Sequence, residues 1–181
     1  PVTASGIYTF TIYDDPSGTL WFGTTHGLFR LIPGHPFDQA PPIGMDFPAT
    51  SIFDDGQGSL WLGGRTHGLV QFRKSDGRVT RYTKHEGLFD GYLSHVLPDD
   101  EGNFWMSTED RIYKASRMDL EDFAEGRTKL VKSTRYGLAD GMKTIASADT
   151  ASQPGGWRTS DGRLWFATVK GLVVIDPKHI R

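Results

Sequence analysis

Residues 12–31 read IYDDPSGTLWFGTTHGLFRL, and this stretch decides the fold because the chain repeats it three more times. The later copies read IFDDGQGSLWLGGRTHGLVQF at 52–72, VLPDDEGNFWMSTEDRIYKA at 96–115 and WRTSDGRLWFATVKGLVVI at 157–175. Each copy has a central tryptophan, and these are Trp21, Trp61, Trp105 and Trp165, separated by 40, 44 and 60 residues. Repeats of about 40–50 residues, each with four short strands, are typical of the blades of a β-propeller.

Each copy divides into short strands separated by turns. In the first copy, residues 8–13 are mostly aromatic and β-branched, which favours a strand. An acidic turn with glycine follows, then a short strand around the tryptophan, a second glycine turn and a third strand. The second copy adds a fourth strand at 78–82. The sequence therefore predicts an all-β β-propeller of four blade-like repeats, each a four-stranded antiparallel sheet, with approximate boundaries 1–46, 47–91, 92–141 and 142–181.

The third and fourth copies depart from this plan in two places. Residues 117–127 are compatible with a helix and end near Gly126, so we expect one or two helical turns before an outer strand at 129–134. Residues 144–156 are small and polar, which predicts a long loop with one irregular strand at most.

The composition excludes several classes of function. The chain has 20 Lys and Arg residues against 22 Asp and Glu residues and no strongly basic stretch, so we expect no nucleic-acid partner. It has no cysteine, which excludes disulfides and thiolate metal sites. It also has no nucleophile elbow, phosphate-binding loop or histidine cluster with metal-ligand spacing. We therefore predict no catalytic residues, no metal and no cofactor.

The repeat has a recognisable consensus. The pattern Asp-x-x-Gly-x-Leu-Trp-Phe-Gly-Thr-x-x-Gly-Leu-x-Arg fits residues 15–30 best, with Pro16 as an extra residue, and fits the second copy well. It resembles the two-component regulator propeller repeat, found in the extracytoplasmic sensor region of bacterial hybrid two-component and sensor histidine kinase-type proteins. The third copy is degenerate, with Met106 and Ser107, and the fourth has Ala167 in place of glycine. The end of the chain, 171–177, resembles the last blade of such a propeller.

The resemblance implies a function. It predicts a non-catalytic, ligand-sensing module of a bacterial receptor that is located in the periplasm and passes its signal to a histidine kinase or a similar output. The implied ligand is a small polar molecule such as an oligosaccharide. The membrane is a partner only through the full-length receptor, which is expected to be a homodimer. We expect the four repeats to be part of a larger ring of about seven blades; a closed four-bladed ring and an eight-bladed ring of two chains are the alternatives.

The predicted ligand-binding residues lie in loops. In a propeller, the loops between the second and third strands share one face with the joints that lead from one blade to the next. Polar and charged residues recur in these loops, and the candidates are His26, Arg65, His67, Asp90, Tyr92, Glu109, Arg111, Lys143 and Lys170. Arginine offers forked hydrogen-bond donors and tyrosine an amphipathic surface, which suits a polar ligand. The alternative is that these loops are polar only because they are loops.

Two other interpretations remain open. The scaffold also supports enzymes such as lyases and glycosidases, and the acidic turn before each tryptophan has a faint similarity to the Asp-box of sialidases. A protein–protein interaction platform is the other alternative, since a fold does not determine a function. For the tryptophans and acidic turns themselves, we expect packing between blades and turn stabilisation rather than contact with a sugar or calcium.

Overall fold

The computed structural model describes residues 7–34, 43, 47–64, 68–88, 92–142 and 155–180. Its strands form four antiparallel sheets, which we call blades 1 to 4 in chain order. Blade 1 contains β1 (Thr9–Asp14), β2 (Leu20–Thr24) and β3 (Gly27–Leu31). Blade 2 contains β4 (Ala49–Asp54), β5 (Ser59–Gly64), β6 (Leu69–Arg73) and β7 (Val79–Tyr82).

The second half of the chain repeats this plan. Blade 3 contains β8 (Leu93–Pro98), β9 (Asn103–Thr108), β10 (Ile112–Ser116) and β11 (Ser133–Tyr136), with helix α1 (Arg117–Ala124) before β11. Blade 4 contains β12 (Gly156–Arg158), β13 (Leu164–Thr168) and β14 (Gly171–Ile175). Short 3-10 helices are η2 (Lys84–Glu86), η3 (Leu138–Asp140) and η4 (Pro177–His179).

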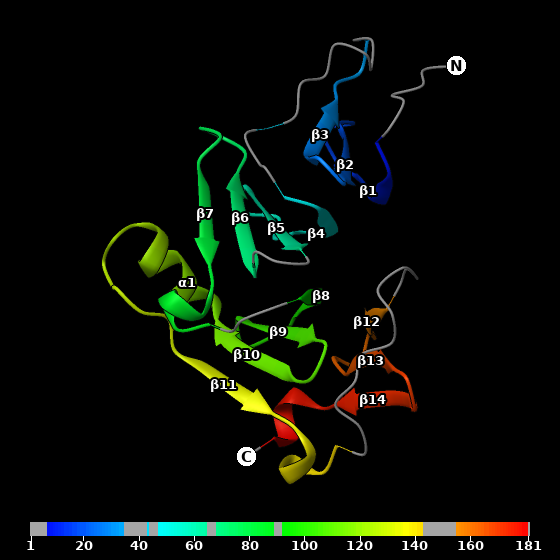
Figure 1. Cartoon of the computed structure of the whole chain (residues 1–181), viewed down its shortest axis with the longest axis vertical. Helices are drawn as coiled ribbons and strands as arrows, with labels where there is room; N and C mark the ends of the chain where they lie inside the picture. The colour runs from blue at the N-terminus through cyan, green and yellow to red at the C-terminus, as the bar shows by residue number, and fades with distance from the viewer. Residues whose placement is uncertain are drawn as a thin grey trace.

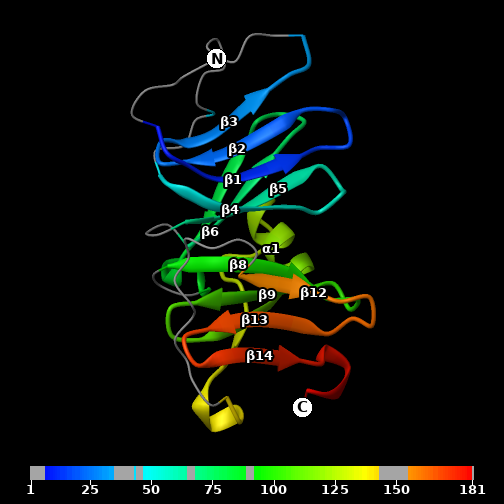
Figure 2. The same cartoon turned by 90° about the vertical axis from the view of Figure 1, so that its right-hand side faces the viewer.

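The blades are arranged in an open arc (Figure 1). The first strands β1, β4, β8 and β12 lie on the inner side, where β1 contacts β4, β4 contacts β8, and β8 contacts β12. Figure 2 shows these strands from the open side of the arc. The all-β propeller prediction is confirmed, whereas closure of the four blades into a small ring is wrong, because blades 1 and 4 lie at opposite ends of the arc.

Two blades show the four strands predicted for each blade. Blades 2 and 3 are four-stranded, but blades 1 and 4 each show three strands within the described residues. In blade 1, the position of a fourth strand is marked by one isolated bridge between Leu28 and Ile43. In blade 4, the chain turns into η4 directly after β14, because Asp176 caps the backbone N–H of Lys178 and Pro177 starts the helical turn.

Three of the four repeat tryptophans pack between blades, as predicted; Trp165 of blade 4 is half-buried. The ring of Trp21 in blade 1 lies 5.7 Å from that of Phe72 in blade 2, and Trp61 in blade 2 lies 4.9 Å from Phe104 in blade 3, both in edge-to-face geometry. Trp105 in blade 3 joins a buried cluster that includes Leu164 and Phe166 of blade 4. Each junction is therefore an indole of one blade set against apolar side chains of the next.

A small residue two positions after each tryptophan allows this close approach. A Cβ atom on Gly63 would clash with Ser51 Oγ and lie only 2.8 Å from the carbonyl oxygen of Leu93 in the next blade. The glycine of the repeat is thus explained by packing between blades rather than by backbone conformation. The third blade has Ser107 at this position, and its hydroxyl is buried without a hydrogen-bond partner among the described residues.

The helix before the outer strand is confirmed, but that strand is displaced from its predicted position at 129–134. The helix α1 is capped by Ser116 and covers the seam between blades 2 and 3, where its Leu120 carbonyl accepts a 2.9 Å hydrogen bond from Tyr82 Oη. The backbone N–H of Val131 donates to Glu86 O of the preceding joint at 2.7 Å. Because that segment pairs with the joint, strand pairing with β10 begins only at Ser133.

Candidate functional site

A cleft of about 410 Å³ runs along the inner side of the arc, and we call it the inner cleft. It is lined by Thr11, Ile12, Tyr13, Ser51, Ile52, Phe53, His95, Val96, Leu97, Pro98, Gly156, Trp157 and Arg158. These residues come from the first strand of every blade, so the cleft lies on the wall of the propeller channel. Its volume falls within the range of about 300–1,000 Å³ that small-molecule sites occupy.

A bulge in the inner strands positions polar side chains on this wall. The pairing register shifts between Thr9 and Thr11 in β1, between Ala49 and Ser51 in β4, and between Leu93 and His95 in β8. Such a bulge redirects the side chains that follow it. Thr11, Ser51 and His95 therefore occupy equivalent positions, each paired with the small residue two positions after the tryptophan.

His95 is held in its neutral form. Its Nε2 accepts a 3.1 Å hydrogen bond from the backbone N–H of Gly155, so the proton of the neutral ring is assigned to Nδ1. Burial lowers the pKa of the imidazole below its ordinary value. His95 Nδ1 is buried without a hydrogen-bond partner among the described residues. The ring therefore carries one uncharged donor that is buried in the channel wall and has no partner among the described residues.

Ser51 adds a second unused polar group. Its side chain is only 8% exposed, and its Oγ has no hydrogen-bond partner within the described part of the chain. A hydroxyl both donates and accepts, and leaving it unpaired in a buried position is costly. Ser51 and His95 thus leave two buried hydrogen-bonding positions beside the inner cleft without a partner among the described residues.

The other end of the inner cleft is more polar and already paired. Arg158 forms an ion pair with Asp100 of the neighbouring blade. Tyr13 Oη donates a 2.9 Å hydrogen bond to Asp54. Burial, followed by this hydrogen bond, raises the pKa of Tyr13 to about 12, so its hydroxyl stays protonated at neutral pH. These groups shape the cleft without offering an ionised nucleophile or base.

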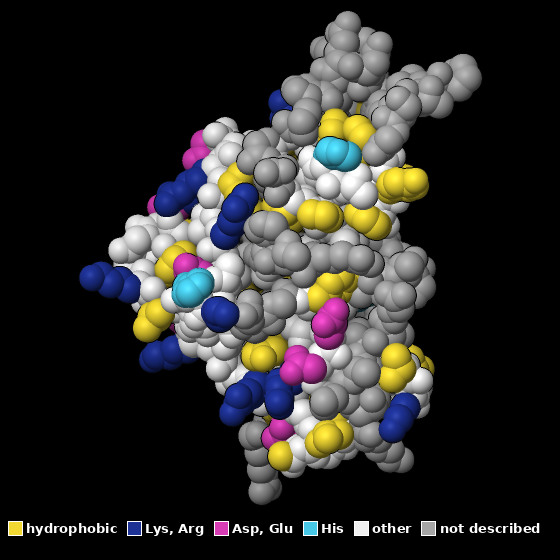
Figure 3. Space-filling view, in the orientation of Figure 1, with side chains coloured by type: hydrophobic (Ala, Val, Ile, Leu, Met, Phe, Trp, Pro, Cys, Tyr) yellow, Lys and Arg dark blue, Asp and Glu magenta, His cyan; other side chains and the backbone are white. Residues whose placement is uncertain are grey.

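The two sets of predicted binding loops do share one end of the propeller. Leu93, at the start of β8, pairs with Thr108, which precedes the turn into β10. Tyr136, at the end of β11, pairs with Ile112 at the start of β10. The loops between second and third strands therefore lie beside the joints between blades, on the same end as Ser51 and His95. On the face of the molecule that Figure 3 shows, basic and acidic side chains lie near one another.

The predicted residues fall into three groups. Arg65, His67, Asp90 and Lys143 lie outside the described residues. Four more lie in exposed or half-buried turns, where His26 Nδ1 contacts Thr25 Oγ1 at 2.9 Å and Arg111 pairs with Asp110 at 3.4 Å, while Glu109 and Lys170 are exposed. Tyr92 is only 7% exposed, so it packs in the protein interior instead of presenting its ring to solvent. A ligand contact by any of the nine stays a prediction.

Sequence reasoning missed Ser51 and His95. Both sit in strands whose other residues are largely apolar, and a polar residue there is a usable signal. Which face each side chain takes depends on the bulge, which the sequence does not mark.

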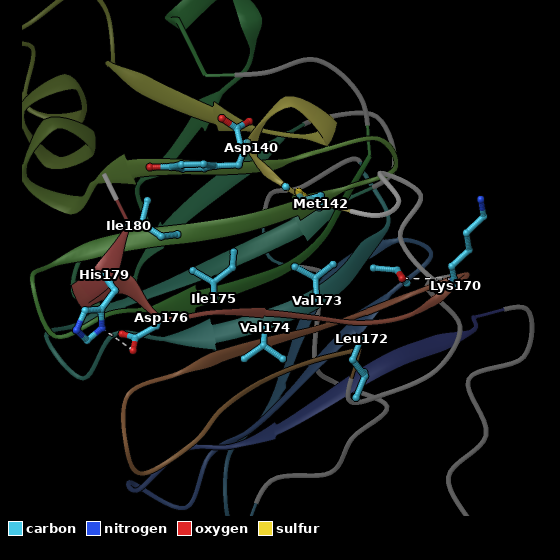
Figure 4. Close-up of a pocket in the computed structure, with 13 residues that line it drawn as sticks. Asp140, Met142, Lys170, Leu172, Val173, Val174, Ile175, Asp176, His179 and Ile180 are labelled. Carbon is cyan, nitrogen blue, oxygen red and sulfur yellow. Dashed lines mark hydrogen bonds and ion pairs between the residues drawn. The ribbon is translucent and has the colours of Figure 1, made fainter.

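A second cavity, of about 510 Å³, lies along β14 in blade 4 (Figure 4). It is bordered by Met142 and Asp140 on one side and by Asp176 on the other, and His179 Nδ1 lies 2.8 Å from that carboxylate. This cavity follows the open outer edge of the three-stranded blade, away from the channel wall.

The described residues contain no group of three or more His, Asp or Glu residues arranged to hold a metal ion. None of the helices among them is long and apolar enough to cross a membrane.

Comparison with known proteins identifies the repeat. Residues 3–26 match the family model described as the two component regulator propeller, which confirms the resemblance inferred from the first copy. No curated protein sequence matches the chain significantly.

Solved structures share the architecture at low sequence identity. The extracellular domain of BT4673 from B. thetaiotaomicron, described as a one component system, has a TM-score of 0.69 and 15% identity, covering 92% of this chain and 21% of that one. The extracellular domain of BT3049 from the same organism, described as a hybrid two component system, has a TM-score of 0.55 and 16% identity, covering 94% and 28%. This chain thus spans less than a third of the length of either of those two chains.

A third similar structure is an enzyme. A catalytically inactive virginiamycin B lyase from Staphylococcus aureus, crystallised with quinupristin, has a TM-score of 0.66 and 14% identity, covering 98% of this chain and 59% of that one. At such identities the likeness shows the fold alone. The chain therefore has a β-propeller fold, and its residues 3–26 are similar to the two-component regulator propeller repeat.

Proposed function

We propose that this chain is the ligand-sensing part of an extracytoplasmic receptor, in the periplasm of a bacterium, and that it binds a small polar ligand such as an oligosaccharide without changing it chemically. The support from comparison is the repeat at 3–26 and the likeness to extracellular domains of signalling proteins. The observation that carries ligand binding is the inner cleft, where Ser51 Oγ and His95 Nδ1 are buried without partners among the described residues.

The chemistry of the inner cleft favours a neutral, hydroxyl-bearing ligand. Its apolar wall includes Ile12, Ile52 and Val96, while Ser51 and the neutral His95 supply directional hydrogen bonds. The charged groups at the far end are neutralised by Asp100 and by Lys74. A strongly ionic ligand would find no uncompensated charge there, whereas hydroxyl groups would satisfy both open positions.

Signalling requires that the ligand prefer one conformation. A ligand shifts an equilibrium between two states only by its difference in affinity for them. The inner cleft is formed by all four blades, so a ligand bound there contacts several blade junctions at once. We propose that the packing of these junctions is what the ligand changes and what a kinase or similar output reads.

An enzyme on the same scaffold is the second candidate. The lyase structure covers nearly the whole chain, and a histidine, His95, lies in the inner cleft. The two functions differ in one measurable respect, since a lyase alters its ligand and a sensor releases it unchanged.

Thermal unfolding of the chain with a panel of neutral oligosaccharides, acidic sugars, amino acids and nucleotides tests binding. A ligand at 100 times its dissociation constant stabilises the folded state by about 2.7 kcal/mol. That corresponds to a rise in Tm of roughly 5–10 °C for a domain of this size. We expect the neutral oligosaccharides to give the largest rise.

Variants locate the binding site. We expect His95→Gln and Ser51→Ala each to weaken binding of the best ligand by about 1 kcal/mol, or roughly fivefold, since each removes one hydrogen bond. The matched controls His85→Gln and Ser17→Ala change exposed residues and should bind normally. Unchanged affinity in both cleft variants would move the site away from the inner cleft.

A further inference from the structure

The side chain at the bulge of an inner strand lies at the boundary with the next blade. In blade 1, a Cβ atom on Gly23 would lie 2.6 Å from Thr11 Cγ2 and 2.5 Å from the carbonyl oxygen of Ala49 in blade 2. Ser51 has the same relation to Gly63 and to the first strand of blade 3. The bulge residue is therefore placed where two successive blades meet at the channel wall.

His95, the bulge residue of blade 3, forms a hydrogen bond across this boundary. Its Nε2 accepts at 3.1 Å from the backbone N–H of Gly155, which directly precedes β12 of blade 4. The strands β8 and β12 lie side by side there (Figure 2). A Cβ atom on Gly155 would clash with His95 Cε1, and one on Gly156 would lie 3.3 Å from His95 Cβ. The imidazole thus packs tightly on the start of blade 4.

The hydrogen bond requires an unprotonated Nε2. A backbone N–H can only donate, and both nitrogens of a protonated imidazole are donors. A proton on Nε2 would therefore point at the N–H of Gly155, and the hydrogen bond would be lost. The proton would also create a charge in a buried position, where His95 Nδ1 has no partner among the described residues. Such a charge is costly unless it is paired, so protonation favours movement of the ring away from blade 4.

The described surroundings provide no free acid to stabilise that charge. The strands β4, β5, β9 and β12 pack against β8. Their ionisable side chains are Asp54, which is bonded to Lys74, and Arg158, which forms an ion pair with Asp100. Tyr13 of β1 also lines the inner cleft and is bonded to Asp54. Burial is accordingly the cause that lowers the pKa of the histidine.

We propose that the contact between His95 and Gly155 is a pH-sensitive latch, in which the neutral ring holds blade 4 against blade 3 and protonation releases it. The latch lies at a junction inside the chain and does not depend on any ligand. Its two halves come from segments 60 residues apart in the sequence. Acid would therefore loosen one blade junction selectively, while the other junctions keep their packing.

The direction of the pH effect follows from the lowered pKa of His95 in the folded state. As the pH falls below the ordinary histidine value of about 6.5, the released ring takes up a proton before the latched ring does. The latched state is thus complete above about pH 6.5 and is lost as the pH falls towards the folded value. Over that range, its equilibrium constant falls by up to about tenfold for each pH unit. The carboxylates at the other junctions titrate only below about pH 4.

Hydrogen exchange of the Gly155 amide, followed by solution NMR of the chain, tests the latch directly. Its protection is the measured exchange rate relative to the rate of an unstructured amide at the same pH, and it reports how often the hydrogen bond opens. We expect this protection to be constant above about pH 6.5 and to fall by up to about tenfold per unit below it. The paired amides of β5 and β6 in blade 2 should keep their protection throughout.

Variants separate the proton from the hydrogen bond. In His95→Gln the side-chain oxygen can still accept from Gly155 but does not titrate, so the protection of that amide should not change between about pH 7.5 and pH 5. His85→Gln is the control, because His85 is exposed in η2 and its removal should leave the native pH profile. Gly155→Ala should displace the ring and move the pKa of His95 towards its ordinary value.

Three results would overturn the latch. The first is a native Gly155 amide whose protection does not change over this pH range. The second is an equal loss of protection in His95→Gln, since the proton would then act elsewhere. The third is a loss of protection at pH 5 that is as large in β5 and β6 as at Gly155, because acid would then unfold the whole chain instead of opening one junction.

Discussion

At the scale of single residues, the acidic turn and the tryptophan form one unit. Asp99 accepts backbone hydrogen bonds from Glu101 at 2.9 Å and Asn103 at 2.8 Å, and its other oxygen accepts Trp105 Nε1 at 2.8 Å. Asp55 does the same for its own turn and for Trp61. The carboxylate thus closes the turn and satisfies the polar atom of a side chain that packs between blades.

We predict that Asp99→Ala lowers the free energy of unfolding by about 2–3 kcal/mol, since it leaves a buried indole N–H and two turn amides without their acceptor. Glu101→Ala is the control in the same turn; Glu101 is exposed, so its removal should cost less than about 0.5 kcal/mol. Urea denaturation measures both. If Asp99→Ala unfolds at the same urea concentration as the native chain, the carboxylate does not support the junction.

In the first blade, the aspartate of the turn does not accept a hydrogen bond from the tryptophan. Trp21 Nε1 is buried without a hydrogen-bond partner among the described residues, although Asp15 stands at the usual position. The second carboxylate oxygen of Asp15 instead accepts a hydrogen bond from Lys74 Nζ of blade 2. The extra Pro16 in this turn is the sequence difference that accompanies the change.

At the scale of elements, a cation fastens one blade to the next. Lys74, directly after β6, bonds both to Asp15 of blade 1 and to Asp54 of its own blade, at 2.8 and 2.9 Å. The hydrogen bond from Lys74 holds the pKa of Asp15 well below its usual range. Burial opposes the charge of Asp54, but the hydrogen bonds from Lys74 and Gly56 outweigh it and lower that pKa as well. Both carboxylates are charged at neutral pH.

This pairing predicts an acid-sensitive junction. A carboxylate with a lowered pKa in the folded state contributes stability that is complete above its unfolded value of about 3.9 and is lost as the pH falls further towards its folded value. Lys74→Met should therefore destabilise the chain by about 2 kcal/mol at pH 7 and should flatten the fall in stability below about pH 4. Chemical denaturation from pH 7 to pH 2 measures both effects.

The control is Lys132→Met, which removes an exposed lysine and should keep the native pH profile. A Lys74→Met profile parallel to that of the native chain would show that the pairing contributes no pH-dependent stability.

The strands could be predicted because local chemistry and tertiary packing agree in them. The run 59–64 is a strand by composition, and its alternate residues also face the two neighbouring blades: Leu60 and Leu62 pack towards blade 1 and Trp61 towards blade 3. The position of the outer strand of blade 3 could not be predicted correctly. The backbone N–H of Val131 donates a hydrogen bond to the carbonyl oxygen of Glu86, which lies far away in the sequence.

At the scale of the whole molecule, the repeat pattern predicted which turns gather at one end of the propeller, but it did not predict which side chains line the wall of its channel. The turn around Arg111 lies where the repeat pattern predicted it. Tyr92 was expected at the ligand-binding face and is buried, because it directly precedes β8 and packs inward. Ser51 and His95 were not foreseen, since a shift of one residue at a bulge reverses the face on which every later side chain lies.

The open arc connects the inner cleft with the tryptophan junctions between blades. The inner strands of all four blades form the inner cleft, and the tryptophan junctions hold those strands at fixed spacing. A ligand at the cleft and the packing between blades are therefore physically connected, as a sensor requires.

The most direct measurement of the proposed function is the mass of the ligand after binding. The chain is incubated with the oligosaccharide that raises its Tm most, and the ligand is then released and weighed by mass spectrometry, with heat-denatured chain as the control. We predict saturable binding and a ligand of unchanged mass. A ligand cleaved or altered only by the folded chain would make the protein an enzyme, and a folded chain that binds no member of the panel would contradict the ligand-sensing function.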